Sequence, residues 1–376
     1  MTELVNLAVA LDERYDERAR AQAIARVEAA GCAVNECDGA EDRVLSWIDL
    51  VFGGAWSGEA FVGTNVVATR GGAPVAFATF APRTLRYRWL RAMAVRPGVG
   101  VFGPFGVAPE ERGSVLGPSV LTLALCGLRR HGYATALIGG VGDERLIAYY
   151  ARHSGARVVE RYDRLRWSAH RYRTVVMATG EGSTFQSLAA AAANGTIPLH
   201  VAAVVCNVAG AGVLERARAS NVPSVALPWE RGRESRASYD ARLCDAVAEL
   251  EPDLVLLLGW MHLLDTRFIR TFRELLNLHP AFLPLDPERD DVGMPDGSTI
   301  PAFRGPRAVT DAFRAKSAWI GSTVHRVSAS ADRGPVVIRV PLKVSPNEDE
   351  AGAYGRLRPI ERAMVPRAVM LWVYER

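Results

Sequence analysis

The stretch Val175-Val176-Met177-Ala178-Thr179-Gly180-Glu181-Gly182-Ser183 decides the fold of the C-terminal half of the chain. Its first four residues are apolar and predict a buried strand, and the two glycines that follow predict a turn into a helix at 185–193. Strands that alternate with helices form a parallel, doubly wound α/β sheet, which binds ligands beyond the carboxyl ends of its strands. The same alternation continues with strands expected at 201–205, 224–227 and 254–258 and helices at 213–219 and 239–250.

The chain divides into two domains, which we place at residues 1–168 and 169–376. Its 376 residues exceed the roughly 150 of a typical domain, and the alternation of the C-terminal half begins only at Thr174, after a tract rich in Arg and Tyr at 157–173. In the N-terminal half, periodicity predicts strands at 99–107 and 134–138 and helices at 118–130 and 144–153. In the C-terminal half we also expect a loop at 286–299, extended runs at 320–327 and 335–342, and a terminal helix at 348–373.

Composition and charge narrow the class of protein. No apolar run reaches the roughly 18 residues of a membrane-spanning helix, and the N-terminus lacks the order of a signal peptide, so we expect a cytoplasmic protein. The five cysteines are scattered, which favours reduced thiols and predicts no metal site. The net charge is +4, but no arginine cluster is interleaved with aromatic residues. We therefore expect neither a nucleic acid nor a membrane as partner.

Three polar residues, Asn277, His279 and Asp332, are of the types that an acyl-transfer site needs. Asn277 and His279 are two residues apart in an extended segment, so their side chains should share one face. An amide N–H can donate to a developing oxyanion, a histidine can act as an acid near neutral pH, and a carboxylate can orient the imidazole and raise its pKa. A capping asparagine, a structural histidine and a turn aspartate would account for the same residue types.

The sequence around these residues resembles the folate-dependent formyltransferase family. The similarity is carried by Asn-Leu-His-Pro-Ala-Phe-Leu-Pro at 277–284, Thr-Val-His at 323–325 and Asp-Arg-Gly-Pro-Val-Val at 332–337, and it extends from about Arg173 to the C-terminus. The branch that formylates phosphoribosylglycinamide looks most similar. The resemblance implies a Rossmann-like sheet for residues 169–376. It also implies 10-formyltetrahydrofolate as formyl donor and the nitrogen of a small-molecule amine, hydroxylamine or hydrazine as acceptor.

The resemblance also implies roles for individual residues. Asn277 and a protonated His279 would stabilise the oxyanion while Asp332 supports the positive charge. Glu361 would anchor the acceptor's amine; alternatively, it caps a surface turn. The residues implied to bind the formyl donor are Met261, His262, Leu263, Leu264, Ser328 and Ala331. Those implied to bind the acceptor are Gly180, Gly182, Ser183 and Glu361.

Two features depart from the family pattern. Glu181 puts a carboxylate into a glycine-rich turn whose backbone N–H groups would otherwise hold a phosphate. The tract 285–300 is longer than the family pattern allows. We therefore expect an acceptor other than phosphoribosylglycinamide.

Three other functions use related chemistry. The main alternative is a phosphoribosylglycinamide formyltransferase of purine synthesis whose N-terminal domain is not catalytic. A formyltetrahydrofolate hydrolase would carry a different N-terminal domain. A transfer-RNA formyltransferase would continue into an RNA-binding barrel beyond the end of this sequence.

The N-terminal half resembles the GNAT family of acyl-CoA-dependent N-acyltransferases, from about Val44 to Val159. The similarity is carried by Gly-Pro-Phe-Gly-Val-Ala-Pro-Glu-Glu-Arg-Gly at 103–113, by the helix that follows, and by Tyr149-Tyr150. It implies a mixed sheet with helices, and acetyl-CoA or another acyl-CoA as a second cosubstrate. The enzyme would then be bifunctional. The alternative is an N-terminal domain that has lost its activity.

In that family the backbone N–H groups of a loop before a helix hold the CoA pyrophosphate. The residues at these positions are Arg112, Gly113 and Gly117. Val115 stands where the family has its first glycine, so a left-handed backbone there would be strained. Tyr150 matches the tyrosine that protonates the leaving thiolate; alternatively, it is a core residue.

Overall fold

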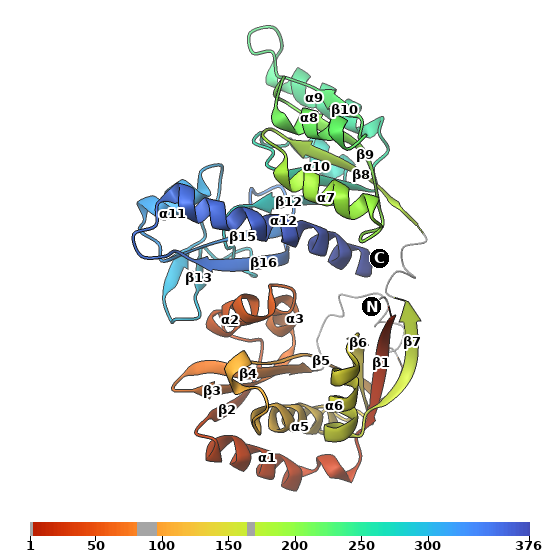
Figure 1. Ribbon diagram of the computed structural model, residues 1–376, viewed down its shortest axis with the longest axis vertical. Coiled ribbons are helices and arrows are strands. Elements are labelled where there is room, and N and C mark those ends of the chain that lie inside the picture. The colour runs from red at the N-terminus through yellow and green to blue at the C-terminus, as the bar shows by residue number, and fades with distance from the viewer. Residues whose placement is uncertain (1–2, 81–95, 164–169) are drawn as a thin grey trace. The chain divides into compact units, whose positions relative to one another are not determined.

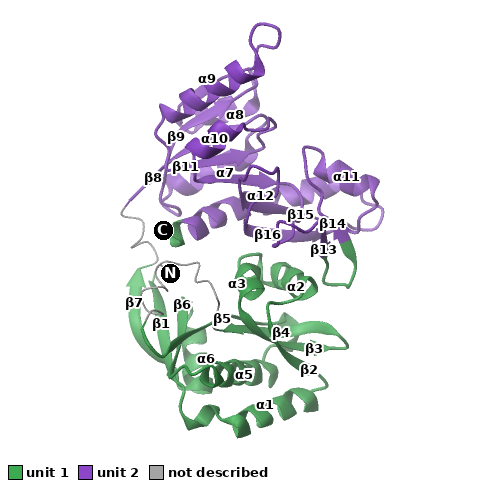
Figure 2. Cartoon of the chain, turned by 180° about the vertical axis from the view of Figure 1, so that it is seen from behind, with its two compact units in different colours: residues 1–167, 293–299, 373–376 green, residues 168–292, 300–372 purple. Residues whose placement is uncertain are grey.

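The computed structural model describes residues 3–80, 96–163 and 170–376. The chain forms two compact units (Figure 2). Unit 1 contains residues 1–167, 293–299 and 373–376, and unit 2 contains residues 168–292 and 300–372. The predicted domain boundary between 168 and 169 lies in the segment 164–169, outside the described residues.

Unit 1 is built on a seven-stranded mixed sheet with the order β2-β3-β4-β5-β6-β1-β7 (Figure 1). Among the described strands, β5 and β6 pair in parallel and the other neighbours pair antiparallel. The strands are β1 (Glu3–Ala10), β2 (Ala33–Asp38), β3 (Thr64–Arg70), β4 (Ala73–Phe80), β5 (Val99–Val107), β6 (Thr135–Val141) and β7 (Arg157–Asp163). The α-helices are α1 (Glu17–Ala29), α2 (Asp42–Phe52), α3 (Ser57–Val62), α5 (Leu116–Arg130) and α6 (Glu144–Ser154), and two short 3-10 helices are η1 (Glu13–Tyr15) and η2 (Pro109–Glu111).

The strands and helices predicted for residues 99–153 are confirmed by β5, α5, β6 and α6, with small differences at their ends. The tract 157–173 was expected only to be rich in Arg and Tyr, yet it contains β7. This strand lies at the edge of the sheet, and Tyr162 is its one buried residue. Because an edge strand need not alternate apolar and polar residues, its sequence carries no clear periodic signal.

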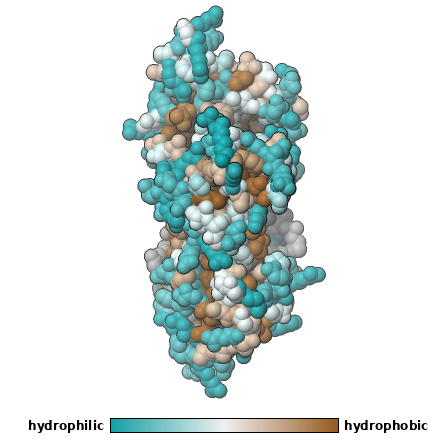
Figure 3. Space-filling view, turned by 90° about the vertical axis from the view of Figure 1, so that its left-hand side faces the viewer, coloured by the Kyte–Doolittle hydropathy of each residue, from teal (hydrophilic) through white to brown (hydrophobic). Residues whose placement is uncertain are grey.

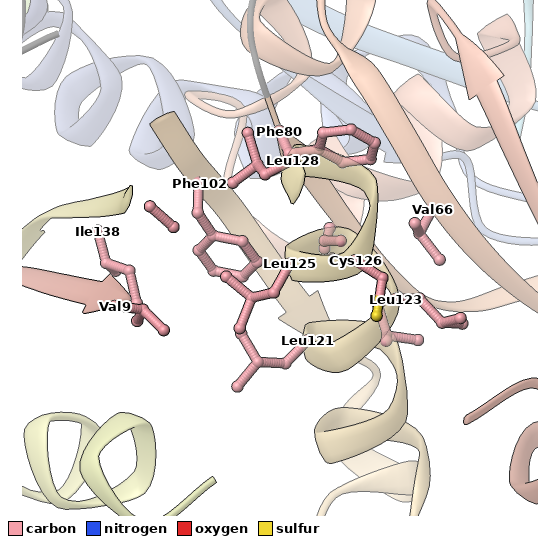
Figure 4. Close-up of a cluster of buried hydrophobic side chains, with 14 of the residues drawn as sticks. Val9, Val66, Phe80, Phe102, Leu121, Leu123, Leu125, Cys126, Leu128 and Ile138 are labelled. Carbon is pink, nitrogen blue, oxygen red and sulfur yellow. The ribbon is translucent and has the colours of Figure 1, made fainter. Parts of the chain in front are cut away.

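The core of unit 1 forms around α5. Leu121, Leu125 and Leu128 of this helix are fully buried together with Phe102 of β5 and Ile138 of β6. Figure 4 shows these side chains gathered beside the helix. Burial of apolar surface contributes about 25 cal/mol per Å², so this contact between the helix and the sheet is a main source of stability in unit 1.

Unit 2 is built on a second seven-stranded sheet, with the order β10-β9-β8-β11-β12-β15-β16. The first five strands are parallel, but β15 is antiparallel to both β12 and β16. The predicted parallel sheet is therefore wrong for β15, which runs opposite to the other six strands of this sheet. A connection of nine residues joins β15 to β16, shorter than the dozen or more that a parallel crossover needs. The strands are β8 (Tyr172–Ala178), β9 (Leu199–Cys206), β10 (Ser224–Ala226), β11 (Leu254–Leu258), β12 (Leu275–His279), β15 (Trp319–Arg326) and β16 (Val336–Lys343).

The helices of unit 2 follow the predicted alternation, and α12 confirms the terminal helix. The loop expected at 286–299 instead contains a strand and leads into a second one, which form a two-stranded sheet around a turn at Asp296-Gly297. Gly297 has a φ of +85°, and Asp-Gly is a strong hairpin signal, so the sequence did contain the evidence. The helices are α7 (Ser183–Ala193), α8 (Gly212–Ala219), α9 (Arg236–Ala248), α10 (Thr266–Thr271), α11 (Ala308–Arg314) and α12 (Glu350–Tyr374). The strands of the two-stranded sheet are β13 (Asp291–Gly293) and β14 (Thr299–Pro301), whose residues 293 and 299 are counted with unit 1.

Hydrophilic residues cover most of the face in Figure 3, and hydrophobic residues occupy smaller areas between them. Within the described ranges, no helix combines the length and the apolar character needed to cross a bilayer.

Candidate active site

The candidate trio comes together at the ends of two antiparallel strands. Asn277 and His279 lie on β12, and Asp332 lies in the turn between β15 and β16. Oδ1 of Asp332 is 3.5 Å from Nδ2 of Asn277 and 3.6 Å from Nδ1 of His279. The three side chains therefore lie close together, although Asn277 and Asp332 are 55 residues apart in the sequence. Their catalytic roles stay predictions.

His325 is a fourth member of this cluster and was not among the predicted catalytic residues. It lies on β15 directly opposite Asn277. Its Nδ1 is 2.9 Å from the backbone oxygen of Arg326, and its Nε2 is 3.1 Å from Nδ2 of Asn277. Because a carbonyl only accepts, Nδ1 carries the proton, and Nε2 accepts a hydrogen bond from the Asn277 amide. His325 thus fixes the direction of that amide. Its place in the Thr-Val-His motif was the available signal.

His279 is buried, with 5% of its surface exposed, and its Nε2 donates to the backbone oxygen of Phe303 at 2.9 Å. Burial lowers the pKa of His279, and the opposing effects of Asp332 and the Phe303 carbonyl do not overcome it. Asp332 does raise the pKa of His279, as expected, but burial outweighs this effect in the free protein. The role of a protonated His279 during the reaction stays a prediction. His279 is neutral near pH 7, and its unprotonated Nδ1 faces the carboxylate.

Asp332 is ionised. Burial by itself raises the pKa of Asp332, but contacts with His325 and His279 and the backbone N–H of Gly305 hold it well below its ordinary value. The N–H of Gly305 donates to Oδ2 at 2.8 Å. Asp332 also has a φ of +54°, which is uncommon for a residue other than glycine and costs conformational energy. In the free protein, the carboxylate of Asp332 therefore carries a negative charge next to the neutral ring of His279.

A cavity of about 1090 Å³ in unit 2 opens onto this cluster. Met261 and Leu263 have 53% and 73% of their surfaces exposed, so the segment after β11 presents apolar surface to a ligand. Its backbone is held by a hydrogen bond of 3.1 Å from the Met261 N–H to Oγ1 of Thr179. Trp260, in contrast, packs into the core. The predicted donor-binding residues all line this cavity: Met261, His262, Leu263, Leu264, Ser328 and Ala331.

The glycine-rich turn lies on the same cavity, through Gly180, Gly182 and Ser183. Gly182 precedes α7 and has a φ of +76°. A Cβ atom placed on Gly182 would lie 2.6 Å from Cγ2 of Val213 in α8, so only glycine fits without movement. The turn therefore brings the first N–H groups of α7 close to α8.

Glu181 lies in this turn between the two glycines. A Cβ atom placed on Gly212 would lie 2.7 Å from its Oε2, so the carboxylate lies against the first residue of α8. The N-terminus of a helix favours a negative charge. The backbone oxygen of Glu181 accepts a hydrogen bond of 2.7 Å from Nε of Arg216.

Glu361 lies on α12 and lines the cavity. Only 5% of its surface is exposed, and the hydroxyl of Ser322 donates to its Oε1 at 2.6 Å. Burial raises the pKa of Glu361 above its ordinary value. The alternative that this residue caps a surface turn is wrong, because it is buried within a helix.

The residues predicted to bind CoA surround the start of α5. Val115 has a φ of −71°, so the predicted strain does not arise; Gly113, with a φ of +80°, takes the left-handed conformation instead. Arg112 is exposed, and its Nε donates to the backbone oxygen of Val107 at 3.3 Å. Gly117 packs against Tyr149. A Cβ atom placed on Gly117 would lie 2.8 Å from the Tyr149 hydroxyl.

Tyr150 lies in the core of unit 1, where its ring contacts those of Phe102 and Phe105. Burial raises the pKa of Tyr150 above its usual range, which makes the phenol a weaker acid. This position fits the alternative of a core tyrosine. The role of Tyr150 as an acid stays a prediction.

Comparisons with known proteins concern the C-terminal half. Residues 172–285 and 296–369 match the family described as Formyl transferase. The Phosphoribosylglycinamide formyltransferase of Mycobacterium tuberculosis is 34% identical over 203 residues, which cover 52% of this chain and 83% of that protein. The protein of the same name from Escherichia coli is 29% identical over 196 residues, with coverages of 52% and 84%. The family match begins at residue 172, so the GNAT resemblance of the N-terminal half stays a prediction.

Among solved structures, glycinamide ribonucleotide transformylase 1 from Symbiobacterium toebii is 29% identical to this chain in sequence. The match covers 55% of this chain and 89% of that chain, with a TM-score of 0.48.

Replacing Gly182 by alanine tests the close contact between the turn and α8. Gly195 is a matched control, because its φ is also +76° but it has open space around it. Both changes should cost roughly 1 kcal/mol of backbone strain. Gly182→Ala should cost about 1–3 kcal/mol more, because the new methyl group overlaps Val213. Urea unfolding measures both, and equal costs would contradict the contact.

The lowered pKa of His279 predicts a pH effect on stability. Because the folded-state pKa lies below the unfolded value near 6.5, the unfolded chain binds more protons as the pH falls through that value. The wild type should therefore lose more stability than His279→Gln between pH 7.5 and 5.5. The contribution of Asp332 is lost only below about pH 4, outside this range. Urea unfolding at three pH values measures the difference, which should shrink as the pH falls; a growing difference would mean a raised pKa.

Proposed function

The chain belongs to the formyl transferase family, and on this premise we propose that it transfers the formyl group of 10-formyltetrahydrofolate to the nitrogen of a small-molecule amine, hydroxylamine or hydrazine. The family implies this formyl donor. The observation that carries the proposal is the convergence of Asn277, His279 and Asp332 at one cavity.

The transfer exchanges one C–N bond for another. The acceptor nitrogen attacks the formyl carbon, the bond from that carbon to N10 of the donor breaks, and the proton lost by the acceptor passes to N10. Holding two substrates side by side in one cavity supplies a large part of the rate enhancement. At best it lowers the activation barrier by about 7 kcal/mol or more. The residues of the chain then have to stabilise one oxyanion and carry one proton.

Asn277 is suited to stabilising the oxyanion. One of its amide N–H groups is held by His325 at 3.1 Å, and the other makes only a long contact of 3.5 Å with Asp332. This second N–H is the donor available to the formyl oxygen as that atom becomes negative.

His279 is suited to carrying the proton. Its Nε2–H is fixed by Phe303, so Nδ1 is the atom that accepts the proton from the attacking nitrogen. The imidazolium then formed lies 3.6 Å from the carboxylate of Asp332, which stabilises it. The protonated histidine therefore arises during the reaction, after which it returns the proton to the leaving nitrogen.

The donor site is supported by the segment after β11 and the loop after β15. Exposed Met261 and Leu263 offer apolar surface to a planar pterin, and the adjacent backbone offers hydrogen bonds. Ser328 and Ala331 line the cavity near Asp332. This arrangement would bring the formyl group of the bound donor to the trio.

The glycine-rich turn and the relatives point to different classes of acceptor. The names of the relatives favour phosphoribosylglycinamide, with the glycine-rich turn binding its phosphate. Glu181 in that turn favours an acceptor without a phosphate dianion, because like charges repel. In either case, buried Glu361 is suited to holding the amine.

Substitution of the trio tests the proposed function. Asn277→Ala, His279→Ala and Asp332→Asn should each lower the release of tetrahydrofolate by roughly 10²–10⁴-fold, since each removes oxyanion stabilisation or proton transfer. The assay uses 10-formyltetrahydrofolate with a panel of amines, hydroxylamines and hydrazines that includes phosphoribosylglycinamide. His200→Ala is the control, because this histidine is exposed and lies outside the cavity. Formyl release without any acceptor would instead indicate a hydrolase.

We also propose that unit 1 binds an acyl-CoA at the start of α5, as the GNAT resemblance implies. In the parallel pair β5–β6, pairing extends only over Val99–Phe102 and Thr135–Ile138, although both strands continue beyond it. At the N-terminus of α5, Val115 provides no side-chain cap, and the Leu116 N–H donates to Oγ of Ser114 at 3.2 Å. Because Pro118 has no N–H, the Gly117 N–H is the donor of this first turn that supports a pyrophosphate site.

A pair of variants tests this site. Val115→Asp adds a negative charge at the end of α5, whereas Val115→Asn has nearly the same shape and no charge. We expect calorimetry to show acetyl-CoA binding at least about tenfold weaker in Val115→Asp and unchanged in Val115→Asn. Equal binding by the two variants, or no binding by the wild type at millimolar concentration, would exclude pyrophosphate binding there.

A further inference from the structure

We propose that Asp290 is a positioning residue for the candidate trio and acts on it through Arg304. This inference rests on the proposed function. Asp290 belongs to the tract 286–295, which the family match leaves out. The tract therefore gives this chain contacts near the site beyond those of the shared family pattern.

Arg304 is held at all three of its guanidinium nitrogens. Nη1 contacts Oδ1 of Asp290 at 2.6 Å, and Nη2 donates to the backbone oxygen of Arg289 at 2.7 Å. Nε donates to the backbone oxygen of Asp332 at 3.2 Å. The side chain is largely buried, with 15% exposed. Arg304 is thus a rigid link between the unmatched tract and the turn that contains Asp332.

The residues on either side of Arg304 contact the trio directly. The carbonyl of Phe303 accepts the hydrogen bond from His279, and the N–H of Gly305 donates to Asp332. Movement of Arg304 would therefore change both partners at once. The proton on Nε2 of His279 and the direction of the Asp332 carboxylate depend on this three-residue segment.

A second arginine binds the same carboxylate. Nη2 of Arg333 lies 2.5 Å from Oδ1 of Asp290, and its Nη1 donates to the backbone oxygen of Pro287 at 2.8 Å. Arg333 follows Asp332, whose backbone has a positive φ. Such a conformation persists only where its surroundings hold it. Asp290 therefore joins two arginines that constrain Asp332. Arg304 donates a hydrogen bond to the backbone oxygen of Asp332, and Arg333 is the next residue in the chain.

The simpler alternative is a surface ion pair without effect on the site. Exposed pairs commonly contribute little, and Asp290 itself is exposed. Two facts favour positioning: each arginine also binds a backbone oxygen of the tract, and both arginines lie next to groups that touch the trio. The neighbouring Asp291 supplies the matched control, because it pairs with Arg289 instead.

The test compares Asp290→Asn, Asp290→Glu and Asp291→Asn in the full chain. Two local probes are followed by nuclear magnetic resonance: hydrogen exchange of the Gly305 amide and of the Nε2 proton of His279. In Asp290→Asn both should exchange about tenfold faster or more, because the segment is released. The kcat should fall by about tenfold, while KM for the formyl donor stays within about twofold. Asp290→Glu should recover most of both losses, and Asp291→Asn should match the wild type.

The outcomes separate the two proposals. If Asp290→Asn matches Asp291→Asn in exchange, or changes only KM, the positioning role is overturned. If the wild type transfers no formyl group to any acceptor, the proposed function fails, while the exchange rates still decide the role of Asp290. Circular dichroism establishes that each variant is folded. Should Asp290→Asn unfold, Asp290→Glu and Arg333→Gln carry the same comparison, and unchanged exchange in Arg333→Gln would count against the proposal.

Discussion

The antiparallel register between β12 and β15 is the constraint on which the site depends. It puts His325 directly opposite Asn277, and the turn after β15 then returns Asp332 to the same side of the sheet. Side chains alternate between the two faces of a strand, so a shift of one residue would send Asn277 and His279 away from their partners. The parallel strands before β12 supply the buried base that holds this register.

Much of unit 2 could be predicted from its sequence because its strands and helices are strongly periodic. Alternation correctly predicted that Asn277 and His279 share a face, and the motifs identified Asp332 as their partner. Alternation could not predict the reversed direction of β15 or the contact of His325 with Asn277. It also could not predict that burial lowers the pKa of His279. Each depends on which strands become neighbours and on how deeply a ring is buried, which are properties of the assembled sheet.

Unit 1 was less predictable because fewer of its segments have a clear hydrophobic period. Periodicity located the strands and helices between β5 and α6, but it gave no strand for β7 and no elements for the first 98 residues. The strain expected at Val115 is absent, because Gly113 takes the left-handed backbone and Val115 does not. The spacing of the motif did not show which residue of this loop has that conformation.

The neutral resting state of His279 bears on which nucleophiles suit the site. An alkylamine in water at neutral pH is largely an ammonium ion, which has no lone pair for attack and must first be deprotonated. A weakly basic nitrogen, such as that of a hydroxylamine or a hydrazine, arrives with its lone pair free. In the proposed mechanism, Nδ1 of His279 removes one proton from the nucleophile in each catalytic cycle. Weakly basic nucleophiles need only that one removal, whereas ammonium ions must lose an additional proton to solvent beforehand.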